Sequence, residues 1–244
     1  MSRHFAQLVD FVIAWPDMTS AMIRQLNDTW CGVALSAGEL VATVVRTTAT
    51  GARSTLEQLL PGDVEWLEPD EDGPGTFELA FALVRRLEAG DESRKEYALH
   101  RDSFSGPAYR IYSAAAQIPV GYVTSYAAVA RVAHSEARAV GRAMATNPLY
   151  PIVPCHRVIG SDFAMVGYGG RQDERALDSK YECLEAEARG FTDESTVQID
   201  GAYLKLYPVE AALEATRSAA AREAWRARER QMGRVAHEAQ LSLF

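Results

Sequence analysis

One cysteine of the chain stands among residues that could make its thiol reactive. Cys155 lies between Pro154 and His156, and several arginines occur nearby. The thiolate is the nucleophilic form of cysteine, and an ordinary thiol with a pKa of about 8.5 is mostly protonated at neutral pH. His156 is the nearest candidate base, but neighbours on an extended strand point to opposite sides, so we expect no direct contact. Nucleophilic catalysis by Cys155 is one interpretation, and an inert buried thiol is the other.

A pair of arginines four residues apart is the second candidate feature. The sequence predicts short helices over 126–133 and 137–146, separated by a brief polar segment. Two such helices form a helix-turn-helix pattern, in which the second helix reads DNA. Arg138 and Arg142 then lie on one face of that second helix. Many enzymes contain similar helix pairs, so this pattern alone leaves DNA binding open.

The distribution of charge favours an anionic partner for this part of the chain. The formal net charge is −8, from 25 basic and 33 acidic residues, which argues at first against nucleic acid. Residues 101–171, however, hold seven arginines against only three acidic residues. This segment is therefore +4, and the rest of the chain must carry −12. Such a separation indicates one segment that faces an anion.

Composition and length restrict the class of protein further. The 244 residues suffice for one large or two small domains, and 48% hydrophobic content excludes a wholly disordered chain. No apolar run approaches the roughly 20 residues that span a bilayer, and Asp10 and Asp17 interrupt any secretory signal. Three scattered cysteines without a Cys-x-x-Cys pair predict neither a disulfide framework nor a zinc site. We expect a reduced, soluble, cytoplasmic monomer that holds no metal and does not bind membranes.

The first 101 residues are expected to form a small α/β domain. Two β-rich runs, 32–35 and 41–45, flank a turn and predict a hairpin. Helical periodicity predicts helices over 54–60 and 77–87. No nucleotide-binding fingerprint or pair of catalytic carboxylates appears here, so we interpret this domain as a scaffold.

Residues 102–194 are expected to form the second domain, which carries the candidate chemistry. A helix over 107–117 precedes the helix-turn-helix pattern, whose first helix is capped by Thr124 or Ser125. After the cysteine, residues 166–170 form a glycine-rich element that permits close approach of backbone to a flat or charged group.

The order of several short motifs resembles one known family. Along the chain occur Ile118-Pro119-x-Gly121, Ser125-Tyr126, Arg138-Ala139-Val140-Gly141, Asn147-Pro148, Pro154-Cys155-His156-Arg157-Val158 and Gly167-Tyr168-x-Gly170. Over about residues 105–190 the chain resembles the O6-alkylguanine-DNA alkyltransferases, also called methylated-DNA–protein-cysteine methyltransferases. The resemblance implies an α/β fold, with an N-terminal RNase H-like domain before a helical, winged-helix-like catalytic domain. The chain departs from the family pattern in a shorter turn before the arginine helix and an apparent insertion over 171–179.

For DNA contact, the resemblance implies that the damaged nucleotide leaves the duplex. Arg138 would fill the vacated stack, because a planar cation can both stack and form hydrogen bonds there. Tyr126 would rotate the phosphate and protonate the leaving guanine. The small residues beside Arg138 permit a close approach to the minor groove. The implied DNA-binding set is Ser125, Tyr126, Arg138, Ala139, Gly141 and Arg142.

For the chemistry, the resemblance implies that Cys155 receives the alkyl group. A bridging water would connect it to His156, and Glu187 would orient that histidine, with Glu185 as the alternative if the insertion shifts the register. Asn147 would brace the site. The implied guanine pocket comprises Pro154, Val158, Tyr168 and Gly169. Because the thioether is stable, each molecule reacts once, without a cofactor, on double-stranded DNA that contains O6-alkylguanine or O4-alkylthymine.

Three other classes of protein fit these residues less well. A Cys-His hydrolase also needs an oxyanion hole and a substrate cleft, and the helix-turn-helix pattern gives no reason for one. The alkyltransferase-like proteins bind lesions without the cysteine, which this chain has. A transcriptional activator would need an additional regulatory module.

Residues 195–244 are expected to form a C-terminal extension outside the family core. A hairpin is predicted over 196–206, around an Asp-Gly turn, and a long helix from Pro208 to about Ala239. The last five residues resemble the peptide by which bacterial repair proteins dock on the DNA-polymerase sliding clamp. We expect either docking of this peptide on a clamp or its packing on the protein's own surface; its candidate contact residues are Gln240, Leu241, Leu243 and Phe244.

Overall fold

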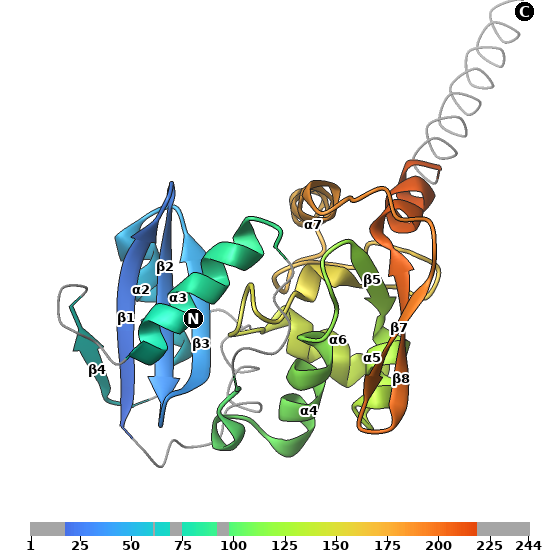
Figure 1. Ribbon diagram of the computed structural model, residues 1–244. Coiled ribbons are helices and arrows are strands. Elements are labelled where there is room, and N and C mark those ends of the chain that lie inside the picture. Colours follow the sequence, from blue (N-terminus) through green and yellow to red (C-terminus); the bar gives the residue numbers. More distant parts are fainter. Residues whose placement is uncertain (1–17, 61, 69–74, 92–97, 219–244) are drawn as a thin grey trace, which may run out of the picture.

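The computed structural model describes residues 18–60, 62–68, 75–91 and 98–218. Within these ranges the chain has the mixed α/β fold predicted from the sequence, with two small sheets. Figure 1 shows the sheets at opposite sides of the molecule, with helices between them. None of the helices in the described ranges combines the length and the apolar character that crossing a bilayer requires.

The first sheet is formed by β1 (Thr19–Leu26), β2 (Thr29–Ser36), β3 (Glu39–Arg46) and β4 (Val64–Leu67), in the order β3-β2-β1-β4. The predicted hairpin is confirmed as β2 and β3, which pair antiparallel. β1 and β4 pair in parallel, and neither strand was predicted.

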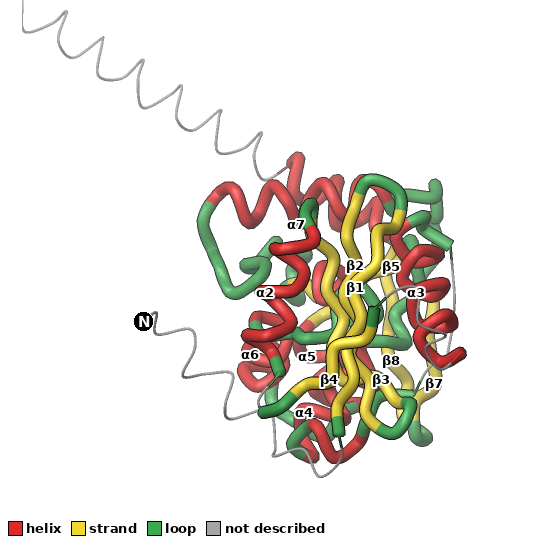
Figure 2. Tube along the Cα trace, turned by 90° about the vertical axis from the view of Figure 1, so that its left-hand side faces the viewer, coloured by secondary structure: helices red, strands yellow, loops and turns green. Residues whose placement is uncertain are grey.

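Two helices cover this sheet. α2 (Ala49–Leu59) and α3 (Gly75–Glu88) lie on its opposite faces, as Figure 2 shows. α2 begins earlier than the predicted helix, because the Thr48 side chain accepts a hydrogen bond from the Gly51 amide and caps it. The other predicted helix is confirmed as α3.

The second part of the chain contains the predicted helices. They are α4 (Gly106–Ala115), α5 (Tyr126–Val132) and α6 (Ala137–Ala145). A further helix, α7 (Glu174–Ala186), was not predicted. Ser125 is the N-cap of α5, since its hydroxyl accepts a hydrogen bond from the Ala128 amide. α6 packs on α5 and α4 through a buried face, formed by Val140, Ala143 and Met144. The arginines of α6 remain on its exposed side.

The second sheet joins the predicted hairpin to the motif-bearing segment. Its strands are β5 (Tyr122–Ser125), β6 (Val158–Ile159), β7 (Ser195–Ile199) and β8 (Ala202–Pro208), in the order β6-β5-β8-β7. The turn of the β7–β8 hairpin has positive φ at Asp200 and Gly201, as a tight two-residue hairpin turn requires. Leu204 and Leu206 are fully buried in the core beneath α5. A helix follows from residue 209 and is described to 218; the rest of the predicted helix lies outside the described residues.

The first sheet also supports the segment that carries the cysteine. The Thr43 amide of β3 donates a hydrogen bond of 2.8 Å to the carbonyl of Pro148. One continuous apolar cluster runs from Val33 and Leu40 of that sheet to Leu149, Val153 and Cys155. The segment before Cys155 is therefore held between both parts of the molecule.

Candidate active site

Cys155 begins a single 3-10 turn, Cys155–Arg157, and does not lie on an extended strand. The expectation of an extended conformation is therefore wrong at this residue. The Arg157 amide donates to the Pro154 carbonyl at 2.9 Å, and this bond closes the turn before β6 starts at Val158. The argument that alternating strand geometry separates Cys155 from His156 consequently does not apply. Cys155 is 8% exposed.

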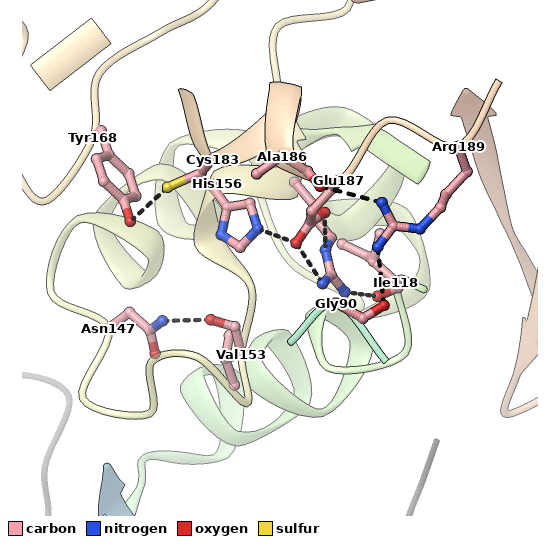
Figure 3. Close-up of polar contacts among 11 residues, drawn as sticks. Gly90, Ile118, Asn147, Val153, His156, Tyr168, Cys183, Ala186, Glu187 and Arg189 are labelled. Atoms are coloured by element: carbon pink, nitrogen blue, oxygen red, sulfur yellow. Dashed lines mark hydrogen bonds and ion pairs between the residues drawn. The ribbon is translucent and has the colours of Figure 1, made fainter. Parts of the chain in front are cut away.

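A buried carboxylate connects His156 to Arg157. Glu187, at the end of α7, accepts a hydrogen bond from Nε2 of His156 at 2.8 Å. It also accepts two bonds from Arg157, from Nη2 at 2.7 Å and from Nε at 2.8 Å. Figure 3 shows these contacts converging on the carboxylate. The insertion thus leaves Glu187 at the histidine, whereas the alternative, Glu185, pairs with Arg217.

Arg157 was not predicted as a functional residue. Its guanidinium is buried, and Nη1 donates to the Ile118 carbonyl at 2.7 Å, in addition to the two bonds to Glu187. The sequence contained a usable signal, because an arginine between a histidine and the hydrophobic residues of β6 is rarely buried without a partner. Arg157 holds the carboxylate that orients His156.

The surroundings of His156 suit a neutral base. Burial lowers the pKa of His156, and the hydrogen bond to Glu187 opposes that effect without reversing it. With Nε2 donating to Glu187, the neutral tautomer has its lone pair on Nδ1. Nδ1 is buried and has no hydrogen-bond partner among the described residues. That nitrogen can therefore accept a proton.

The surroundings of Cys155 favour a resting thiol. Burial raises the pKa of Cys155, while the Asn147 amide and the Lys180 ammonium act in the opposite direction and do not overcome it. The proton must consequently leave during the reaction, which requires a base. Asn147 also braces the segment before the cysteine: Nδ2 donates to the Val153 carbonyl at 2.7 Å, and Oδ1 accepts from the Leu149 amide at 3.0 Å.

Hydrogen bonds from Lys180 and Tyr126 connect the glycine-rich element, residues 166–170, to this site. Lys180 is buried, and its Nζ donates to the carbonyls of Val158 at 2.7 Å and Gly167 at 3.4 Å. Burial lowers the pKa of Lys180 to about 8. The Tyr126 hydroxyl donates to the Val166 carbonyl at 3.1 Å. Burial raises the pKa of Tyr126 to about 12, so this phenol remains protonated and able to donate.

A cavity of about 570 Å³ opens onto Cys155. Of the predicted site residues, it brings together Cys155, Tyr126, Arg138, Gly141, Arg142, Tyr168 and Gly169. Several others lie outside its lining, namely Ser125, Ala139, Asn147, Pro154, His156, Val158 and Glu187. Of these, Ser125 caps α5, and the Val158 carbonyl is bonded to Lys180. The cavity therefore joins the arginine helix to the reactive thiol.

The insertion contributes lining residues, and one neighbour of the cavity was also not predicted as a site residue. Arg171 and Gln172, from the apparent insertion, line the cavity. The Tyr168 hydroxyl lies 3.9 Å from Sγ of Cys183, as Figure 3 also illustrates. Only the fold brings these residues to the site.

Comparison with known proteins defines the class. Residues 107–189 match the family model described as 6-O-methylguanine DNA methyltransferase, DNA binding domain. This range contains the helix-turn-helix pair, the Cys155 turn and α7. Fold and site thus define a DNA-binding alkyltransferase.

Curated relatives and solved structures support the same class of protein. The methylated-DNA–protein-cysteine methyltransferase of Mycobacterium leprae is 37% identical over 131 residues, covering 52% of this chain and 72% of the relative. The enzyme of the same name from Mycobacterium tuberculosis H37Rv is 37% identical over 125 residues, covering 50% and 72%. The crystal structure of a single-residue variant of Mycobacterium tuberculosis OGT aligns with a TM-score of 0.50 and 27% identity, covering 72% of this chain and 97% of that one. The chain belongs to the methylated-DNA–protein-cysteine methyltransferase family, shares its enzymatic activity, and functions in DNA repair.

Proposed function

We propose that the chain transfers an alkyl group from O6 of guanine in DNA to Sγ of Cys155, once per molecule. The observation that carries this assignment is the cavity itself. It joins Cys155 to the arginine helix, and His156 lies next to that cysteine in the same turn. In the described part of the chain, the other two cysteines do not line this cavity. A flipped-out nucleotide is the DNA substrate that such a cavity can admit.

The proposed transfer is a direct displacement. The thiol proton of Cys155 passes to Nδ1 of His156, either directly or through a bridging water. Sγ then bonds the alkyl carbon as the carbon–O6 bond breaks, and the electron pair remains on the guanine. Tyr126 supplies a proton to this leaving group and regains one from solvent. Glu187 stabilises the imidazolium, because its low pKa keeps it ionised.

The direct test is the mass of the intact protein after incubation with an oligonucleotide that contains O6-methylguanine. One added methyl group per chain, found on the peptide with Cys155, is the expected result. No mass gain, or methyl on Cys31 or Cys183, would contradict the proposal. The same assay with O4-methylthymine tests our proposal that this base is also a substrate.

Arg138→Ala is expected to slow transfer from duplex DNA by about tenfold or more, since extrusion of a base costs a few kcal/mol and the proposed filler of the stack is lost. Single-stranded substrate should restore part of the rate. Arg131→Ala is the matched control, because Arg131 is an exposed arginine on α5 that does not line the cavity. Single-turnover rates measure both. A wild-type rate of Arg138→Ala on duplex DNA would refute this role.

We also propose a finer domain architecture and location. The sheet with α2 and α3 on its two faces supports an RNase H-like scaffold, and the pairing of β5 with the β7–β8 hairpin beside α4–α6 supports a winged-helix-like domain. The protein acts as a cytoplasmic monomer, associated with the nucleoid if the source is bacterial. Gel filtration tests the monomer.

A sliding clamp is the second proposed partner. Gln240, Leu241, Leu243 and Phe244 lie outside the described residues, so this proposal depends on the sequence alone. The apolar side chains of Leu241, Leu243 and Phe244 are suited to a hydrophobic cleft on a partner, with Gln240 adding polar specificity. Tethering would raise the local concentration of the protein on replicating DNA.

Deletion of residues 240–244 is expected to abolish binding to a bacterial clamp and to leave the rate of alkyl transfer in solution unchanged. Clamp binding is measured by surface plasmon resonance with the full chain as reference. Unchanged clamp affinity, or a large fall in melting temperature, would show that these residues serve another purpose.

A further inference from the structure

The cavity at Cys155 is more positive than its substrate base requires. Arg138, Arg142 and Arg171 line it, and no acidic residue does so in the described part of the chain. The whole chain nevertheless carries a net charge of −8. An alkylated guanine base is uncharged, so these cations serve another group of the substrate. In DNA that group is the phosphate backbone.

Arg171 is held in place by a tight turn. The Tyr168 amide donates to the Arg171 carbonyl at 2.8 Å, and the Arg171 amide donates to the Tyr168 carbonyl at 3.0 Å. Between them, Gly169 and Gly170 have φ values of 55° and 74°, which favour glycine. Arg171 therefore lies directly opposite Tyr168, a wall of the cavity, although it belongs to the insertion.

Asp173 fixes one edge of the Arg171 guanidinium. Its Oδ2 accepts from Nε of Arg171 at 2.7 Å, while its Oδ1 caps α7 through the Ala176 amide at 3.1 Å. The hydrogen bond from Arg171 lowers the pKa of Asp173, which is therefore ionised. Among the described residues no other group bonds this guanidinium, whose side chain is 61% exposed. Nη1 and Nη2 are consequently available to an acceptor from outside the protein.

We propose that Arg171 binds a backbone phosphate of the DNA strand that carries the damaged nucleotide, and so positions that nucleotide over Cys155. This inference depends on the proposed function. Arginine suits the role, because its planar guanidinium donates two parallel hydrogen bonds to phosphate oxygens. An effect on the thiol does not explain its placement, because the cation that lowers the Cys155 pKa is Lys180. The insertion thereby adds a DNA contact to the rim of the cavity.

The test replaces single phosphates near the lesion with uncharged methylphosphonates and measures single-turnover transfer below saturation. When the methylphosphonate replaces the phosphate that Arg171 binds, the unaltered chain should transfer the methyl group about threefold to tenfold more slowly. This is a typical effect for a charge-assisted contact at a partly exposed site. Arg171→Ala should show the same loss on unmodified DNA and no further loss at that position. Its binding should also depend less on salt, with a slope smaller by about 1.

Two further variants complete the test. Arg171→Lys retains the charge and should recover part of the rate. Arg175→Ala removes an exposed arginine that does not line the cavity, and should respond to every methylphosphonate as the unaltered chain does. If Arg171→Ala remains as sensitive as the unaltered chain at every position, the inference is wrong. If the unaltered chain transfers no methyl group from DNA that contains O6-methylguanine and no methylphosphonate, the proposed function itself fails.

Discussion

Replacement of Cys155 with alanine is expected to abolish alkyl transfer and to leave the affinity for DNA within about twofold. The reaction needs a thiol, and among the described residues no other thiol lines the cavity. Tyr168 and Tyr126, which do line it, are phenols whose pKa values burial raises. The side chain is small and 8% exposed at the base of the cavity, so its removal leaves the arginine helix intact. The intact mass after exposure to methylated DNA measures transfer, and fluorescence anisotropy measures binding.

Cys31→Ala is the matched control for the loss of a thiol. Cys31 lies in β2, is fully buried, and does not line the cavity, so this variant should still gain one methyl group. Methylation of the Cys155→Ala chain at Cys183 would contradict the assignment, because Cys183 lies near the site through its contact with Tyr168. Loss of DNA affinity by Cys155→Ala would mean that the thiol supports the fold of the binding face.

Local sequence signals predicted most of the elements around the site. The Ser125 cap, the α5–α6 pair and the Asp200-Gly201 hairpin depend on short-range hydrogen bonds and backbone preferences, which neighbouring residues specify. The strands β1 and β4 were missed. β4 pairs with β1, which lies about 45 positions earlier in the sequence, whereas β1 and β2 form a local hairpin around Asn27 and Asp28.

The contacts that organise the chemistry were only partly predictable. The spacing from Lys180 to Glu187 led to the correct carboxylate at His156, although the bonds themselves join residues about 30 positions apart. The 3-10 turn at Cys155 was missed because it is a single turn, closed by the bond from the Arg157 amide to the Pro154 carbonyl, directly before the strand β6. Arg171 and Gln172 line the cavity because of the path that the insertion takes. The sequence motifs on either side of the insertion do not specify that path.

Glu187→Gln is expected to lower the free energy of unfolding by about 3 kcal/mol at neutral pH, because it leaves the buried guanidinium of Arg157 without a counter-charge. The same change should slow transfer by about tenfold to hundredfold, since an amide cannot stabilise the imidazolium of His156. Urea denaturation measures the first effect, and single-turnover transfer measures the second.

The neighbouring carboxylate provides the control. Glu185 lies two residues earlier, pairs with Arg217 at 3.0 Å, and has a side chain that is 55% exposed. An exposed pair contributes little, so Glu185→Gln should change neither stability nor transfer appreciably. Equal effects of the two substitutions would show that the His156–Glu187–Arg157 cluster has no special role.

The stability difference between the unaltered chain and Glu187→Gln should depend on pH. Burial by itself raises the pKa of Glu187, but the hydrogen bonds from His156 and Arg157 outweigh it and bring the pKa from 4.5 to about 2. A carboxylate with a lowered folded-state pKa stabilises the protein above about pH 4.5, and this contribution disappears as the pH falls towards 2. Both chains also lose stability as the pH falls below about 6.5, because burial lowers the pKa of His156 and the unfolded chain takes up that proton first. Urea midpoints between pH 3 and pH 7 should therefore show the two chains furthest apart above pH 5 and converging at the acidic end. Parallel curves over this range would mean that Glu187 does not carry the charge that holds the cluster together.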